Sequence, residues 1–388
     1  MKTTGAVITG GDFQALGVIR SLGRKGIPVH VLDHEFSIGR FSRYCRSFTV
    51  APSPTKEIEY LSFLLAFSKK LKAGRWVLYA NNDLVVGLLS KHKKILEEHY
   101  YIPTPGWEVI KYVYNKKNAY QLAESLGIPT PRTYYPQDIS DVEKLDLSFP
   151  VIIKPATRDN FFDIFRKKAF LIRDRQHLLQ TYQKVCDFMD PSEVLIQEFI
   201  PVGPKHLYSF CPFFKEGKVV ARIMARRSRQ HPMDFGQATT FAETVHIPEL
   251  EDMGKKFLDK IGYYGLAEVE FMFDTRDKKY KFLEVNARVW GWHTLAIGAG
   301  IDLPYLLFQD MIGQPMRIPT SQSDVKWIRL ITDIPIVIGE MMKGRMSLKD
   351  YVSSLRGKRE FAVFSLDDPW PFFVEFLMIP YLWLKRGF

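Results

Sequence analysis

Apolar and polar positions follow two different rhythms along the first third of the chain. Residues 6–9 form a short apolar run, a glycine turn follows, and residues 13–24 carry apolar positions at helical spacing. A second apolar run at residues 28–33 completes a predicted β-α-β unit, and residues 76–80 predict another buried strand. Because strands that alternate with helices favour a parallel sheet, we expect residues 1–110 to form one α/β domain.

The glycine turn after the first strand has two interpretations. Gly10 and Gly11 follow the strand, but the strict Gly-x-Gly-x-x-Gly pattern that binds the pyrophosphate of a dinucleotide is absent. A structural turn is therefore favoured, and an NAD-dependent oxidoreductase of the Rossmann type stays as an alternative.

The middle of the chain shows a boundary followed by a smaller unit. Two prolines and a glycine interrupt the periodicity at residues 103–106. A helical pattern then covers residues 116–126, and apolar runs at residues 151–153 and 194–200 predict two strands. The segment 159–168 lies between these strands and is rich in charge and phenylalanine, so we expect it to form a mobile cover rather than core.

The strand rhythm is clearest in a predicted hairpin whose polar turn centres near Asp277. With this turn, Glu270 lies opposite Glu284. Glu268 lies opposite Asn286 on the same face, because residues two apart on a strand share a side. One face of the hairpin therefore collects three carboxylates and an amide.

Like charges that face each other across strands are destabilising, so this face needs compensating cations. Hard oxygen ligands suit Mg²⁺, which proteins usually hold with one or two carboxylates plus nucleotide phosphates. The alternative is an acidic strand face that nearby basic side chains neutralise, and a slip of one residue in register would undo the alignment. The candidate neutralising residues are Lys278, Lys279, Lys281 and Arg288.

The same hairpin resembles a known family. Glu284, Asn286 and Arg288 at alternate positions match the Glu-x-Asn-x-Arg strand of ATP-grasp enzymes, and Glu270 matches the preceding strand that supplies their other metal carboxylate. Four further segments resemble the family in the same order along the chain. They are Asn115-Lys116 at a helix start, Gly127-Ile128-Pro129 at its exit, Ile153-Lys154-Pro155 at a strand end, and the hinge-like run Gln197-Glu198-Phe199-Ile200-Pro201.

The resemblance implies a fold and a reaction. The fold is α/β: an ATP-grasp fold with an N-terminal Rossmann-like domain over residues 1–110, a lid over 111–195 and a larger antiparallel unit with the metal site over 196–320. ATP lies between the last two. The implied enzyme is an Mg-ATP-dependent, ADP-forming ligase that joins a carboxylate to an amine through an acyl phosphate, with Mg²⁺ or Mn²⁺ as the metal.

The resemblance also implies the site residues. Glu270, Glu284 and Asn286 hold the metal. ATP contacts Lys116, Lys154 and Lys168 with its phosphates, and the hinge residues Gln197, Glu198, Phe199 and Ile200 with its adenine. Arg288, with Arg227 or Arg229, stabilises developing negative charge, because guanidinium groups bind phosphate and carboxylate in a bidentate manner.

Within the superfamily, the glycine-containing start of the chain and Trp290-Gly291 resemble the carboxylate–amine ligase branch, related to D-aspartate ligase. Two departures are visible. The acidic residue that usually contacts the ribose after the hinge is replaced by Pro204-Lys205-His206, and no glycine-rich loop follows Lys154. A non-catalytic ATP-binding or regulatory protein therefore stays as an alternative to the ligase.

Charge and composition limit the classes of partner that we expect for this chain. The net charge of +11 favours an anionic partner, but no aromatic stacking motif accompanies the arginines, so nucleic acid is not expected. The expected partners are small-molecule carboxylate and amine substrates and a second copy in a homodimer. Three scattered cysteines and the lack of a signal peptide predict a cytoplasmic protein with reduced thiols.

The last segment, residues 321–388, lies beyond the resemblance. Its end is aromatic and apolar and closes on Lys385 and Arg386, but Glu375 and Pro380 interrupt it. Two interpretations stay open. The segment docks on the core, which we favour, or it lies at a membrane interface, as apolar and basic segments do.

Overall fold

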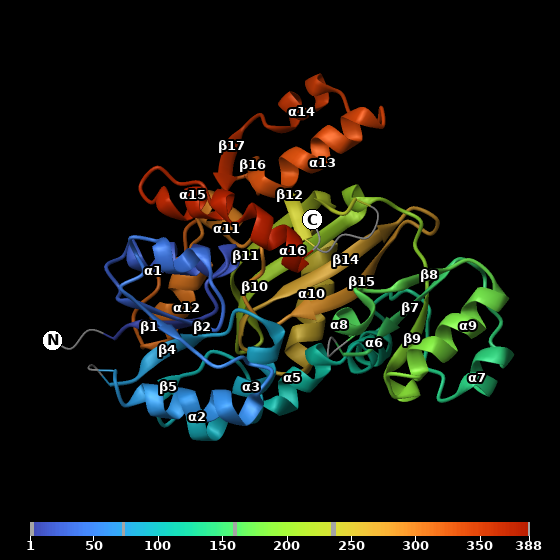
Figure 1. Cartoon of the computed structure of the whole chain (residues 1–388), viewed down its shortest axis with the longest axis horizontal. Helices are drawn as coiled ribbons and strands as arrows, with labels where there is room; N and C mark the ends of the chain where they lie inside the picture. Colours follow the sequence, from blue (N-terminus) through green and yellow to red (C-terminus); the bar gives the residue numbers. More distant parts are fainter. Residues whose placement is uncertain (1–3, 72–73, 158–160, 234–237, 387–388) are drawn as a thin grey trace.

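The computed structural model describes residues 4–71, 74–157, 161–233 and 238–386. Within these residues there are three sheets, and each lies in a different region of the molecule (Figure 1). Residues 159 and 160 of the predicted cover lie outside the described residues, and the rest of that segment contains the short helix α8 (Phe161–Phe165).

The N-terminal domain is built on a five-stranded parallel sheet with the strand order β3-β2-β1-β4-β5. The inner strands β1, β2 and β4 are largely buried between helices, which explains their nearly continuous apolar sequences, whereas the edge strand β3 is more exposed. Asp12 caps the first helix by accepting hydrogen bonds from the backbone N–H groups of Gln14 and Ala15. The elements are β1 (Ala6–Thr9), α1 (Phe13–Gly23), β2 (Val29–Asp33), η1 (Ile38–Phe41), β3 (Ser47–Val50), α2 (Glu57–Ser68), β4 (Trp76–Tyr79), α3 (Asp83–Lys91), α4 (Lys93–Leu96), β5 (Tyr100–Tyr101) and α5 (Trp107–Tyr114).

The second unit has a four-stranded antiparallel sheet with the order β6-β9-β7-β8 and an apolar core of its own. The predicted boundary between residues 195 and 196 falls inside strand β9, which pairs with both β6 and β7. The elements are α6 (Lys116–Ser125), β6 (Thr133–Tyr134), α7 (Ile139–Lys144), β7 (Val151–Pro155), β8 (Phe170–Ile172), α9 (Arg175–Cys186), η2 (Pro191–Glu193) and β9 (Val194–Glu198). We call this unit the lid.

The third unit is an eight-stranded sheet that runs β15-β14-β10-β11-β12-β16-β17, with β13 paired to β10. The long strands at its centre are β10 and β11, and helix α10 covers one face. The elements up to residue 320 are η3 (Pro204–His206), β10 (Leu207–Lys215), β11 (Lys218–His231), β12 (Ala238–Thr244), α10 (Pro248–Lys260), β13 (Gly265–Leu266), β14 (Glu268–Asp274), β15 (Lys279–Asn286), α11 (Thr294–Gly298) and α12 (Leu303–Met311).

The C-terminal segment joins the fold instead of standing apart from it. Its strand β16 pairs with β12, and β17 pairs with β16. Arg20 of α1 forms a buried ion pair of 2.9 Å with Asp368, which ties the segment to the N-terminal domain. The elements are β16 (Val325–Ile328), α13 (Leu330–Met342), α14 (Leu348–Ser354), β17 (Lys358–Phe361), α15 (Trp370–Leu377) and α16 (Ile379–Arg386).

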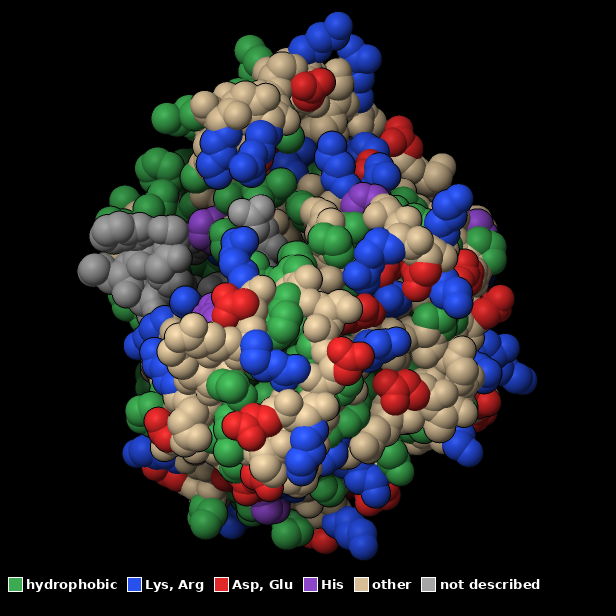
Figure 2. Space-filling view, turned by 90° about the vertical axis from the view of Figure 1, so that its right-hand side faces the viewer, with side chains coloured by type: hydrophobic (Ala, Val, Ile, Leu, Met, Phe, Trp, Pro, Cys, Tyr) green, Lys and Arg blue, Asp and Glu red, His purple; other side chains and the backbone are tan. Residues whose placement is uncertain are grey.

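Helices α13 and α14 project at the top of the molecule, and α15 lies against η1 beside α1 (Figure 1). Seen from the lid side, Lys and Arg side chains are prominent around this projecting end, and hydrophobic side chains gather along the edge next to it (Figure 2). Among the residues that the structure describes, no helix has the length and apolar character needed to cross a bilayer.

Candidate active site

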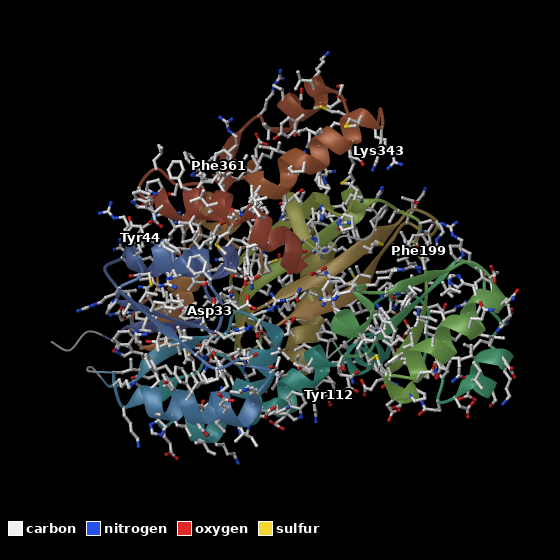
Figure 3. The ribbon with its side chains drawn as sticks, in the orientation of Figure 1. Asp33, Tyr44, Tyr112, Phe199, Lys343 and Phe361 are labelled. Atoms are coloured by element: carbon white, nitrogen blue, oxygen red, sulfur yellow. The ribbon has the colours of Figure 1, made fainter. Side chains whose placement is uncertain are left out.

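A cavity of about 520 Å³ lies where the lid, the hairpin β14–β15 and the start of α1 come together. Figure 3 labels Phe199 at the junction between the lid and the large sheet. Of the residues predicted from the sequence, all except Arg229 line this cavity: Lys116, Lys154, Lys168, Gln197, Glu198, Phe199, Ile200, Arg227, Glu270, Glu284, Asn286 and Arg288.

The hairpin has the register predicted for its acidic face. Glu270 pairs with Glu284, and Glu268 pairs with Asn286. Near the turn the register differs by one residue, because Phe271 pairs with Phe282.

A β-bulge at Leu283 accounts for this one-residue difference. Because of the bulge, Leu283 and Glu284 both line the cavity, although neighbouring residues of a regular strand face opposite ways. Tyr120 of α6 donates its hydroxyl to the Leu283 carbonyl at 2.7 Å, which satisfies the backbone at this irregularity.

The acidic face is held together by an amide and an arginine. Asn286 Nδ2 donates to Glu268 Oε2 at 3.0 Å and to Glu270 Oε1 at 2.8 Å. Arg227 of β11 forms an ion pair with Glu270 at 2.5 Å. Burial, and then the neighbouring Glu270 carboxylate, raise the pKa of Glu268, whereas Arg227 and the Ser209 hydroxyl oppose this shift.

The basic residues of the neutralising alternative mostly lie elsewhere. Lys278 and Lys279 are exposed at the turn, and Lys281 pairs with Glu198 at 2.8 Å and Asp274 at 2.9 Å. Arg288 reaches the face where its Nη2 donates to Asn286 Oδ1 at 3.3 Å. Arg227 and Lys116 also approach the carboxylates, the latter with its Nζ 3.6 Å from Glu284 Oε2.

The donor set fits a hard divalent cation that arrives with a nucleotide. Within the described residues, no three Asp, Glu, His or Cys side chains are placed to hold a metal ion by themselves. Mg²⁺ does not require such a group, since it normally keeps several waters and takes one or two protein carboxylates plus phosphate oxygens. Glu270, Glu284 and the Asn286 amide oxygen line the same cavity and supply ligands of this kind.

Lysines from the lid side lie opposite the acidic face. Lys154 of β7 is partly buried, and its Nζ donates to the Tyr120 hydroxyl at 2.7 Å and to Gln197 Oε1 at 2.8 Å. Burial lowers the pKa of Lys154 to about 8. Because both of these partners are neutral, an anionic ligand in the cavity would stabilise the charged ammonium. Lys116 stands at the start of α6, where Asn115 caps the helix.

The hinge borders an apolar slot that the motifs did not reveal. Leu207, Met272 and Leu283 from the large sheet face Ile152 and Ile200 across the cavity. Such a slot suits a flat aromatic base, with polar groups confined to one edge. Met272 could have been found from the sequence, because it follows Glu268 and Glu270 at alternate positions of one strand. Leu283 could not, because only the bulge turns it inward.

Glu198 at the end of β9 fixes the hinge to the large sheet. Its carboxylate accepts a hydrogen bond from the Arg132 backbone N–H at 3.1 Å and one from Lys281 Nζ at 2.8 Å. The contact from β9 to β15 sets the distance between the two walls of the slot. This role of the Glu198 side chain is additional to the backbone contact with adenine that the resemblance implies.

The three predicted arginines have different surroundings. Arg288 forms an ion pair with Asp83 at 2.7 Å at the edge of the cavity, and the side chain of Arg227, which is 12% exposed, lies in its wall. Arg229 lies outside the cavity, where its guanidinium binds both oxygens of Asp333 at 2.7 and 2.8 Å. A bulge at Ser228 separates two residues that would otherwise share a strand face, so Gln230 lines the cavity in place of Arg229.

Comparisons with known proteins agree with this arrangement. Residues 224–318, which include the whole hairpin, match the family described as the carbamoyl-phosphate synthase L chain, ATP binding domain. The chain is 26% identical over 335 residues to D-aspartate ligase from Enterococcus faecium, a match that covers 81% of this chain and 78% of that protein.

Two solved structures show the likeness of the fold. An L-amino acid ligase from Bacillus licheniformis superposes with a TM-score of 0.64 at 14% identity, covering 80% of this chain and 75% of that chain. The biotin carboxylase domain dimer of 2-oxoglutarate carboxylase from Hydrogenobacter thermophilus, solved with MgADP, ADP and bicarbonate, has a TM-score of 0.64 at 17% identity and covers 83% of this chain and 72% of that one. These likenesses confirm the fold class that the motifs predict.

Proposed function

We infer that this chain, which has the ATP-grasp fold, is an ADP-forming ligase that joins a carboxylate to an amine through an acyl phosphate. The observation that carries this function is a single cavity in which the acidic face of β14–β15 lies opposite Lys116 and Lys154. A cavity with both signs of charge fits a polyanion that brings a divalent cation with it. The matches to D-aspartate ligase and to L-amino acid ligase support an amino acid as one substrate.

Different residues bind the phosphates, the base and the metal ion. Lys116, Lys154 and Lys168 hold the phosphates of ATP, and the hinge from Gln197 to Ile200 holds the base against the apolar slot. Glu270, Glu284 and Asn286 would hold Mg²⁺. When bound, the ion neutralises phosphate charge and makes the terminal phosphoryl group a better electrophile. The cofactors of the reaction are therefore ATP and Mg²⁺, for which Mn²⁺ can substitute.

Catalysis in this proposal rests on positioning and electrostatics. The substrate carboxylate attacks the γ-phosphorus, ADP leaves, and the resulting acyl phosphate loses its phosphate when a neutral amine attacks the acyl carbon. Arg227 and Arg288 border the cavity from two sides and stabilise the negative charge that develops. Arg229 has no place in this step because Asp333 occupies its guanidinium.

A thermal unfolding series tests the proposal. A ligand that binds only the native state raises the unfolding temperature, so the series compares Mg-ATP, ATP with a chelator, and NAD. A rise confined to Mg-ATP, followed by ADP release when amino acids and amines are supplied together, is the expected result. Binding of Mg-ATP without ADP release for any pair would favour the non-catalytic alternative, and a rise with NAD alone would favour the oxidoreductase.

A further inference from the structure

Helices α13 and α14 form the projecting end of the molecule, and each has exposed apolar side chains on its outer side (Figure 1). Ile334, Ile338 and Met342 recur at every fourth position of α13, so they form one stripe along the helix. Leu348 and Val352 form a shorter stripe of the same kind on α14. The other side of α13 packs against strands β11 and β12. We call the two exposed stripes the apolar face.

A groove of about 310 Å³ lies beside the apolar face, because Tyr351 and Leu355 of α14 line it next to Val352. Helices α13 and α15 and strand β17 also contribute to its lining, and Figure 3 labels Phe361 on β17. The apolar side chains that line it are Ile328, Leu330, Leu355, Phe361, Phe364 and Phe372. Contiguous exposed apolar surface of this kind indicates an interaction site, because large apolar patches are rare on monomeric soluble proteins.

Basic side chains accompany the apolar face. In the segment 343–359 the exposed basic residues are Lys343, Arg345, Lys349, Arg356, Lys358 and Arg359, and the exposed acidic residue is Asp350. Glu340 is buried and balances part of this charge, since it lies 3.2 Å from Lys343 and 3.8 Å from Arg345. Lys and Arg side chains are prominent at this end of the molecule in Figure 2. The projecting end therefore combines exposed apolar side chains with an excess of positive charge.

These two properties together limit the class of partner. A second copy docked through the same face would bring its own basic residues against these, and like charges across an interface are unfavourable. Nucleic acid would match the charge but offers no apolar interior to cover Met342 and Leu348. The surface of a bilayer with anionic lipids offers both, because its negative headgroups lie directly above hydrocarbon.

We propose that the apolar face and its basic residues dock the protein on the surface of a bilayer that contains anionic lipids. Apolar stripes of this kind enter the boundary between headgroups and acyl chains to a depth of roughly 5–10 Å, while Lys349 and Arg356 contact the headgroups. The contact is peripheral, in keeping with the lack of a spanning helix among the described residues. Packing on the core and docking on the bilayer then belong to opposite sides of the C-terminal segment.

This surface is separate from the candidate active site. The residues of the apolar face, Lys349 and Arg356 do not line the cavity proposed for ATP. The bilayer proposal therefore does not rest on the ligase function, and substitutions in the apolar face should leave the response to Mg-ATP unchanged.

Sedimentation of the full chain with lipid vesicles tests the proposal. One set of vesicles contains phosphatidylcholine alone, and the other contains phosphatidylcholine and phosphatidylglycerol in equal amounts. We expect binding to the mixed vesicles at low salt and much weaker binding to phosphatidylcholine alone. Binding should also decrease at high salt, because salt screens the attraction between exposed charges.

Two double variants separate the apolar and the charged contributions. Met342→Ser with Leu348→Ser removes side chains that are 83% and 67% exposed and should weaken binding by about tenfold or more. Lys349→Gln with Arg356→Gln should weaken it by about ten- to thirtyfold at low salt, from roughly fivefold for each basic residue near an anionic surface. Because all four residues are exposed, both variants should keep the unfolding temperature of the unsubstituted chain.

The matched controls lie on elements away from the projecting end. Ile58→Ser with Ile95→Ser removes exposed apolar side chains from α2 and α4, and Lys255→Gln with Lys260→Gln removes the same amount of charge from α10. Both controls should bind the mixed vesicles as the unsubstituted chain does. An equal loss of binding in the lysine control would indicate attraction to the whole chain, whose net charge is +11, and would contradict a dedicated surface.

Absence of binding to the mixed vesicles would overturn the proposal, and so would binding that both double variants of the projecting end retain in full. Light scattering tests a second copy as the other occupant of the apolar face. A dimer that dissociates in the variant with Met342→Ser and Leu348→Ser, in a chain that does not bind vesicles, would assign the apolar face to a second copy and would refute the bilayer contact.

Discussion

Two cavities meet at Asp12 and Phe13, and they are lined by different kinds of element and side chain. The larger one, of about 520 Å³, is walled by strands of two sheets and sets carboxylates against lysines. The smaller one, of about 250 Å³, is walled by loops at strand ends and by the C-terminal helices, and its Arg329 is paired with Glu375. The first arrangement suits a polyanion with its metal. The comparison teaches that the net charge of the chain, which is +11, does not predict which charged side chains line a cavity.

The largest effect is expected when one carboxylate is removed from the larger cavity. Glu284→Gln keeps the shape of the side chain but removes a charge that the proposed Mg²⁺ needs. We expect ADP formation to fall by about 10²–10³-fold, the range seen when one group that stabilises transition-state charge is lost. The rate of ADP release, with circular dichroism to verify folding, measures the effect.

The control for this substitution lies on the same hairpin. Asp277→Asn removes a carboxylate at the exposed turn, where it pairs with Lys281 at 3.4 Å. ADP formation should be unchanged in this variant. Full activity of Glu284→Gln would overturn the metal assignment.

The next prediction compares Arg227 and Arg229, which both lie on strand β11. Arg229→Met leaves the buried Asp333 carboxylate without its cation, so we expect the free energy of unfolding to fall by about 3–5 kcal/mol. Arg227→Met should instead slow ADP formation, because Arg227 borders the cavity. Urea unfolding and ADP release measure the two effects.

A double variant separates charge from packing at this ion pair. Arg229→Met combined with Asp333→Leu removes both charges, and replacing a buried pair by apolar side chains is often close to neutral. We therefore expect it to recover much of the lost stability. A single Arg229→Met variant with normal stability and no activity would return Arg229 to the proposed catalytic group.

The hairpin and Arg229 show what the sequence can and cannot predict. Alternation placed Glu268, Glu270, Glu284 and Asn286 on one face, and the structure has those pairs because the bulge at Leu283 restores the predicted register. The family resemblance implied a role for Arg227 or Arg229, which would share one face of a regular strand, and the bulge at Ser228 turns Arg229 away from the cavity. A bulge depends on packing from elsewhere in the chain, such as Tyr120 bonding to the Leu283 carbonyl, so no local pattern announces it.

The smaller cavity was beyond the reach of sequence patterns for a related reason. Its floor and roof come from residues about 300 positions apart, as in the pair of Phe13 with Arg329. The predicted boundary at residue 321 separated β12 from β16, which the structure pairs in one sheet. Motifs revealed the five ordered segments of the larger site because each lies within a few residues, whereas the smaller site exists only after the ends of the chain pack together.

A smaller effect is expected when the pH is varied, because the larger cavity contains a lysine with a lowered pKa. Lys154 has a pKa of about 8 without ligand, and phosphate binding favours its charged form. The ammonium is present below that pH and is lost as the pH rises through it. The dissociation constant of Mg-ATP should therefore be flat up to about pH 8 and then rise by up to about tenfold per pH unit.

Calorimetric titration at several pH values measures this constant. Lys154→Met should bind Mg-ATP more weakly and lose the dependence above about pH 8. The same slope in this variant would assign the titration to another group.

The smallest expected effect concerns the outer face of the helix that roofs the smaller cavity. Helix α15 buries Glu375 toward Arg329 while Phe376 is 65% exposed on its other side, so it docks on the core and still presents an apolar surface. Phe376→Ser should change the free energy of unfolding by no more than about 0.5 kcal/mol and leave the Mg-ATP response intact, because the side chain touches neither cavity. Sedimentation with phosphatidylglycerol vesicles then decides between the two interpretations of this segment. Binding that Phe376→Ser abolishes would place α15 at a membrane interface, and absence of binding in the unsubstituted chain would leave docking on the core as its role.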